Sequence, residues 1–209
     1  MRAKNVEFEV TYISKESKPD WFLEVSPHGK VPVLKVNNDA LFESNAISEF
    51  LDEVVEPQLA PKGPIERARN RAWTDFTGGW AGALNRVSYA KTREEHSSAV
   101  DALPITLIKI ENALGQRKNN GPYFNDDKLC LVDAAYAPFL MRFNIVENIN
   151  PTGILKGFPR IKAWSDALLA NEAVVGSVSE DFSEVFNVNL HKRESLSAKI
   201  LDQRSAAAE

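Results

Sequence analysis

Short runs of alternating apolar and polar residues dominate the first quarter of the chain and predict strands and helices in turn. Residues 6–13 place Val6, Phe8, Val10 and Tyr12 on one face, which predicts a half-buried strand. The pattern also predicts a helix at 19–24 with Trp21 and Phe22 directed inward, strands at 31–36 and 40–43 joined by a turn at 37–39, and an amphipathic helix at 44–55. This mixture of short elements predicts an α/β domain.

The pattern changes after residue 55. Residues 56–64 contain three prolines and a glycine, a composition that interrupts regular structure. Beyond them apolar residues recur at helical spacing and predict helices at 65–89, 94–117 with a kink at Pro104, 131–146 and 158–169. The sequence therefore predicts three parts, namely an α/β domain at residues 1–55, a linker at 56–63 and an all-helical domain at 64–209.

Composition narrows the possible partners. The 209 residues are 44% apolar and 26% charged, as in ordinary soluble globular proteins. A net charge of −4 gives no electrostatic basis for binding nucleic acid or an anionic membrane, and no apolar run reaches the length of a membrane span. A single cysteine excludes an internal disulfide and fits a reducing cytoplasm. Three scattered histidines without ligand spacing predict no metal site.

The candidate chemistry lies within residues 28–54. Val31-Pro32 stands at the start of a strand, and Glu43-Ser44 stands where a strand passes into a helix. At such a helix start, free backbone N–H groups and the positive end of the helix dipole lie beside a carboxylate and a hydroxyl. This combination suits an amino-acid-like ligand, whose carboxylate contacts the N–H groups and Ser44 while Glu43 attracts its ammonium. The simpler alternative is an N-capping Ser44 beside an exposed acid.

These runs resemble a known family. Gly-Lys-Val-Pro-Val-Leu at 29–34 and Leu-Phe-Glu-Ser-Asn-Ala-Ile at 41–47 are similar to the glutathione-binding half of the thioredoxin-like domain in glutathione transferases. Lys-Pro-Asp-Trp-Phe at 18–22, followed by Ser-Pro at 26–27, is most similar to omega-like bacterial members. The resemblance implies a thioredoxin-like α/β domain followed by an all-helical domain, glutathione as co-substrate, and a homodimer.

The resemblance also implies roles for individual residues. Val31, before a cis-proline at Pro32, would pair its backbone with the cysteine moiety of glutathione. Glu43 and Ser44 would hold the γ-glutamyl end, and Lys18 would reach the glycine carboxylate. A co-substrate cleft would be lined by three residues of the long helix, Trp73, Thr77 and Trp80, although apolar stripes of this kind more often belong to a core.

The resemblance leaves the chemistry open. In the family, the catalytic Cys, Ser or Tyr lies at the start of the first helix, whereas Met1 to Val10 resembles the end of that helix and the second strand. We therefore expect the first strand and most of the first helix, roughly 20 residues, to be absent, and with them the catalytic residue. We further expect the chain as written to be inactive with glutathione and unstable over its first 55 residues.

Two functions remain open from the sequence. The first is a glutathione transferase that uses glutathione for conjugation, or for thiol transfer and reduction, with small electrophiles or disulfides, in a detoxifying role. The second is a non-enzymatic relative that acts by binding a protein, as the stringent starvation proteins bind RNA polymerase. The matching residues Lys18, Glu43 and Ser44 favour the first.

Cys130 and Asp133 introduce the predicted helix at 131–146. A thiol at a helix N-terminus can be activated as a nucleophile, because the helix dipole lowers its pKa. The family has Ser or Thr at this position as part of a capping box, with Asp at the third helical position. We therefore interpret Cys130 as structural and Asp133 as a capping acid that binds backbone N–H groups.

Overall fold

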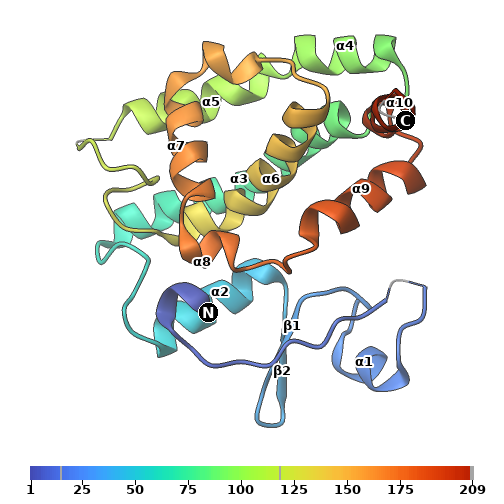
Figure 1. Cartoon of the computed structure of the whole chain (residues 1–209). Helices are drawn as coiled ribbons and strands as arrows, with labels where there is room; N and C mark the ends of the chain where they lie inside the picture. Colours follow the sequence, from blue (N-terminus) through green and yellow to red (C-terminus); the bar gives the residue numbers. More distant parts are fainter. Residues whose placement is uncertain (15, 118, 208–209) are drawn as a thin grey trace. The chain divides into compact units, whose positions relative to one another are not determined.

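The computed structural model describes residues 1–14, 16–117 and 119–207, which belong to two compact units, Met1–Arg67 and Ala68–Glu209 (Figure 1). The described elements of the first unit are the 3₁₀ helix η1 (Arg2–Lys4), α1 (Asp20–Val25), β1 (Val33–Val36), β2 (Asp39–Phe42) and α2 (Ser44–Val54). The segment predicted as a linker, residues 56–63, lies at the end of this unit.

The regular elements among the described residues of the second unit are all helices. They are α3 (Pro64–Ser88), which begins in the last residues of the first unit, followed by α4 (Arg93–Ala102), α5 (Pro104–Gly115), α6 (Leu131–Ile149), η2 (Ile154–Gly157), α7 (Pro159–Leu169), α8 (Glu172–Val175), α9 (Phe182–Lys192) and α10 (Leu196–Ala206). The predicted helices are confirmed, with one change. Pro104 begins a separate helix, α5, instead of kinking a single long one, since proline is well tolerated at a first helical position.

An antiparallel hairpin organises the first unit. β1 and β2 pair with Val33 opposite Phe42 and Val36 opposite Asp39. Asn37 occupies the turn with φ of 54°, a left-handed conformation that asparagine tolerates better than most residues. The hairpin predicted from the sequence is therefore confirmed, and β2 leads directly into α2.

The strand predicted at residues 6–13 is wrong. This segment has no regular structure, and Phe8, Val10 and Tyr12 are exposed instead of sharing a buried face. A strand requires a neighbour to complete its hydrogen-bonded ladder, and the sheet found among the described residues consists of β1 and β2 alone. The inward orientation predicted for Trp21 is also wrong, since α1 buries Phe22 and leaves Trp21 51% exposed.

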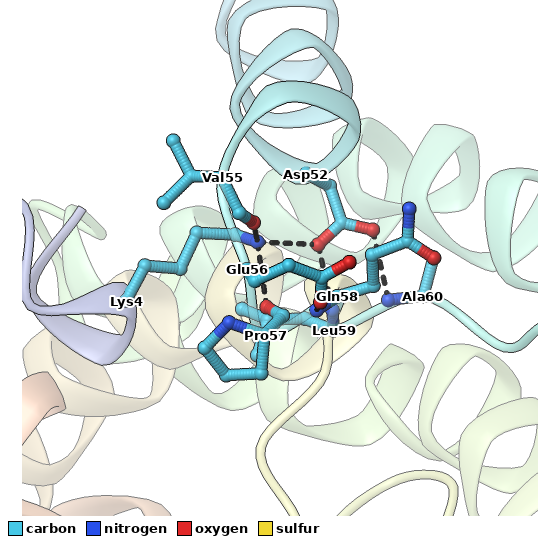
Figure 2. Close-up of polar contacts among 8 residues, drawn as sticks. All are labelled: Lys4, Asp52, Val55, Glu56, Pro57, Gln58, Leu59 and Ala60. Carbon is cyan, nitrogen blue, oxygen red and sulfur yellow. Dashed lines mark hydrogen bonds and ion pairs between the residues drawn. The ribbon is translucent and has the colours of Figure 1, made fainter.

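A buried ion pair lies within the first unit. The Lys4 ammonium lies 2.9 Å from Asp52 Oδ1, and it donates hydrogen bonds to the carbonyls of Val55 (2.6 Å) and Pro57 (2.7 Å) (Figure 2). Lys4 and Asp52 are 5% and 4% exposed, so both charges are removed from water. Because a buried charge is costly unless it is fully paired, each partner depends on the other.

We expect this pair to make the first unit sensitive to acid. Burial by itself would raise the pKa of Asp52, but hydrogen bonds from the Leu59 N–H, the Lys4 ammonium and the Ala60 N–H outweigh burial and lower that pKa below its usual value. The unfolded chain therefore binds the proton more readily. The stabilisation is complete above the unfolded pKa of about 3.9 and is lost as the pH falls from there through the native pKa.

Urea titrations between pH 3 and pH 6 test this expectation. Asp52→Asn should reduce the steepness with which the free energy of unfolding falls in acid. Glu53→Gln is the matched control, because Glu53 is the exposed neighbour on the same helix. An unchanged acid dependence in Asp52→Asn would show that this carboxylate does not contribute.

The core of the second unit surrounds α6. Its largest fully buried side chains are Trp80, Tyr136, Phe143 and Trp164, which come from α3, α6 and α7. The Tyr136 ring lies 5.4 Å from the ring centroids of both Trp80 and Trp164. Aromatic contacts of this kind stabilise a core beyond the effect of buried area alone. None of the helices formed by the described residues is long and apolar enough to cross a membrane.

Asp133 fixes the start of α6. Its carboxylate accepts hydrogen bonds from the Cys130 N–H (2.8 Å), the Phe124 N–H (2.9 Å) and the Trp164 Nε1–H (2.6 Å). The prediction of a capping acid that binds backbone N–H groups is confirmed. Cys130 completes a capping box and is 2% exposed. Burial raises the pKa of its thiol well above the usual value, which is the opposite of an activated nucleophile.

Candidate functional site

A tight loop before β1 forms one side of a pocket. The Ser26 hydroxyl donates a hydrogen bond to the Lys30 carbonyl (2.9 Å) and accepts one from the Lys30 N–H (3.0 Å). One side chain therefore holds the two ends of the loop together. Gly29 has φ of 57°, a conformation that suits glycine because other residues have a clashing Cβ there. The loop presents His28 and Lys30 and leads into the Val31–Pro32 peptide bond, which is cis.

The junction between β2 and α2 forms the other side of the pocket. Glu43 precedes the helix with φ of 65° and ψ of 118°, a positive φ that is rare for a residue with a side chain. Its carbonyl accepts the first hydrogen bond of the helix, from the Ile47 N–H (3.0 Å). Glu43, the N-cap residue of α2, makes no side-chain capping hydrogen bond, and the N–H groups of the first turn form the positive end of the helix dipole.

The loop and the junction meet in one pocket. Its lining comprises Ser26, His28, Lys30, Val31, Pro32, Phe42, Glu43 and Ser44. The structure thus brings together four residues that the sequence analysis singled out, Val31, Pro32, Glu43 and Ser44. Lys18 is not part of this lining. Its Nζ atom lies beside the loop, 3.6 Å from the position that a Cβ on Gly29 would take.

The sequence analysis did not assign His28, Lys30 or Phe42 to the site. His28 packs its ring edge to face against Phe42, with centroids 5.6 Å apart and an interplanar angle of 83°. Lys30 and Phe42 could have been predicted from their position in the sequence, because each directly precedes a residue of the motif. Lys30 and Glu43 give the pocket one cationic and one anionic side chain, which matches a ligand that carries both charges.

The residues predicted for a co-substrate cleft lie on α3, in the second unit. Trp80 is fully buried against Tyr136. Trp73 is half-buried, and its carbonyl accepts a hydrogen bond from the Tyr136 hydroxyl (2.8 Å). The Thr77 hydroxyl is buried. The role of all three in a cleft stays a prediction, in which Trp73 and Thr77 are the members with exposed surface.

The part of the chain that the structure describes contains no cluster of metal-binding side chains. There, no group of three or more His, Cys, Asp or Glu side chains is placed to hold a metal ion.

Comparisons with known proteins show what the chain is similar to. A family model described as "Glutathione S-transferase, N-terminal domain" matches residues 1–54. Glutathione S-transferase U16 of Arabidopsis thaliana is 28% identical over 184 residues, which cover 83% of this chain and 78% of that protein. Glutathione S-transferase omega-1 of Rattus norvegicus is 27% identical over 166 residues, which cover 78% and 67%.

Solved structures of similar fold cover most of the chain. The tau-class glutathione S-transferase of mango, Mangifera indica, has a TM-score of 0.78 at 26% identity and covers 93% of this chain and 90% of its own. Rice GST1 in complex with glutathione has a TM-score of 0.72 at 26% identity and covers 92% and 89%.

The chain is similar to glutathione transferases, and omega-class and tau-class proteins are among the similar proteins. The first unit of the chain corresponds to the thioredoxin-like α/β domain of these transferases, and its second unit corresponds to the all-helical domain. The fold class predicted from the sequence is therefore confirmed.

Proposed function

We propose that this chain binds glutathione in the pocket between the residue 26–32 loop and the start of α2, and that this binding serves a glutathione transferase reaction. The observation that carries the proposal is the convergence of Val31, Glu43 and Ser44 on one pocket at the N-terminal end of a helix. The glutathione complex of the similar rice protein supports the choice of ligand.

The pocket offers a separate partner for each charge of a γ-glutamyl group. The first-turn N–H groups of α2 and the Ser44 hydroxyl are donors for its α-carboxylate, which the helix dipole also stabilises. The Glu43 carboxylate is an acceptor for its ammonium. In this proposal the Val31 backbone contacts the cysteinyl part of glutathione, and Lys18, beside Gly29, attracts the glycine carboxylate.

The proposal extends to the reaction and the assembly. Glutathione would serve in conjugation, or in thiol transfer and reduction, with a small electrophile or disulfide as the second substrate. The half-exposed Trp73 and Thr77 of α3 would contact that substrate. A cytoplasmic homodimer with a detoxifying role completes the proposal, on the strength of the similarity to glutathione transferases.

Titration with glutathione tests the site directly. Ser44→Ala removes one hydroxyl donor to a charged group, a loss of about 1.5–3 kcal/mol, so the Kd should rise about tenfold or more. Ser48→Ala is the matched control, because Ser48 lies one turn further along α2 and outside the pocket lining. Equal affinities in the two variants, or no binding by the parent protein, would contradict the proposal.

A further inference from the structure

The helix that carries the proposed site has little apolar anchoring. Among the described residues of the first unit, the buried apolar side chains are Phe22 and Ile47, and Ile47 alone belongs to α2. Val54, in the last turn of the same helix, is 59% exposed. Since apolar burial normally fixes a helix to its neighbours, α2 needs another means of fixing its C-terminal end.

The polar network around Lys4 supplies that means. The ammonium has three N–H donors, and three acceptors surround it at hydrogen-bond distance, namely Asp52 Oδ1 and the carbonyls of Val55 and Pro57. Asp52 belongs to the last turn of α2, and Val55 is its C-cap residue. A cation at this end also complements the negative end of the helix dipole.

The network continues into the segment that follows. Asp52 accepts hydrogen bonds from the N–H groups of Leu59 (2.6 Å) and Ala60 (3.0 Å) through its two oxygens (Figure 2). Three stretches of chain, namely residues 1–5, the end of α2 and residues 55–60, are thereby joined at one buried ion pair. None of these contacts involves the pocket lining.

We propose that Lys4 is a positioning residue for glutathione, acting through the Lys4–Asp52 pair at the far end of the helix that begins with Ser44. This proposal rests on the proposed function. A helix of 11 residues is rigid, so fixing its C-terminal end also fixes the direction in which its first-turn N–H groups point. Releasing that end lets α2 tilt against β1, and the N–H groups lose their placement relative to Val31.

The test must separate positioning from stability. Lys4→Met alone leaves the Asp52 charge buried and unpaired, so the double variant Lys4→Met with Asp52→Asn is used to remove that charge as well. Lys4→Arg is a milder second variant, because it keeps the charge but cannot match the same three acceptors with a planar guanidinium. Lys62→Met is the matched control, since Lys62 is an exposed lysine of the same unit.

Two measurements are made at a temperature at which circular dichroism shows every variant to be folded. Calorimetric titration should give a glutathione Kd about tenfold higher in the double variant, several-fold higher in Lys4→Arg and unchanged in Lys62→Met. Hydrogen exchange of the α2 amides should be faster in the double variant and should return towards the parent rate when glutathione saturates the site. A purely structural role would lower stability without this selective, ligand-reversible effect on α2.

The outcomes distinguish this inference from the proposed function. A folded double variant with the affinity and the α2 exchange rates of the parent would overturn the role of Lys4. A parent protein that does not bind glutathione would overturn the proposed function and, with it, the role of Lys4 at that site. The exchange rates of α2 in the absence of ligand would then still show whether Lys4 holds this helix.

Discussion

Asp133→Ala is expected to prevent cooperative folding of the helical unit at room temperature. The substitution removes the acceptor for three donors, namely the Phe124 N–H, the Cys130 N–H and the Trp164 indole N–H. Asp133 is fully buried, so water cannot replace the lost carboxylate. Each unsatisfied buried donor costs about 1–3 kcal/mol, and their sum is comparable with a total stability of about 5–15 kcal/mol.

Urea unfolding followed by circular dichroism measures the effect of Asp133→Ala. Asp133→Asn should fall between the parent and the alanine variant, because the amide keeps one oxygen as acceptor. Asp166→Ala serves as the control, since the Asp166 side chain is 58% exposed and pairs with Lys162 within its own helix. A midpoint for Asp133→Ala within experimental error of the control would refute the assigned role.

The helices of the second unit could be predicted because their signal is local and repeated. Apolar positions recur along α3, α6 and α7 at the helical period, so the sequence by itself indicates which face each helix buries. The hairpin was predictable for a similar reason, since a polar turn separates two short apolar runs. In each case the described structure contains the neighbouring elements that the predicted helix or strand packs against or pairs with.

The segment at residues 6–13 shows where local patterns fail. Its alternation is as regular as that of a real strand, but a strand is defined by a partner, which a local pattern does not contain. The Lys4–Asp52 pair could not be predicted from the sequence, for a different reason. No periodic pattern marks a lysine and an aspartate that are distant in the sequence as buried partners. Both residue types are usually exposed, so their burial is not expected from the sequence.

The candidate site was predicted as a set of residue types and not as a geometry. Val31, Glu43 and Ser44 could be found because a strand start and a helix start impose known backbone requirements. The positive φ of Glu43 could not be found, since it belongs to residue types such as Gly, Asn and Asp far more often than to Glu. The position of Glu43 therefore combines a carboxylate that we propose to bind the ligand with an unfavourable backbone conformation.

Glu43→Gly is expected to change stability and ligand affinity in opposite directions. A residue with a side chain at φ of 65° stores roughly 1–3 kcal/mol of backbone strain, which glycine largely avoids. Part of this gain is offset by about 0.5–1 kcal/mol, because glycine loses more conformational freedom on folding. Loss of the carboxylate that pairs with the ligand ammonium should still raise the glutathione Kd about tenfold or more.

Comparison with Glu43→Ala separates the two contributions, because alanine removes the carboxylate but keeps the strain of a Cβ at positive φ. Both variants should lose affinity to a similar extent, whereas Glu43→Gly should be more stable than Glu43→Ala by about 1 kcal/mol or more. Urea titration and glutathione calorimetry on the two proteins give both quantities. If the glycine variant were no more stable than the alanine variant, the backbone at Glu43 would not be strained. If the glycine variant kept the parent affinity, the Glu43 carboxylate would have no part in binding, and the charge-matched pocket at the start of α2 would have to be reassigned.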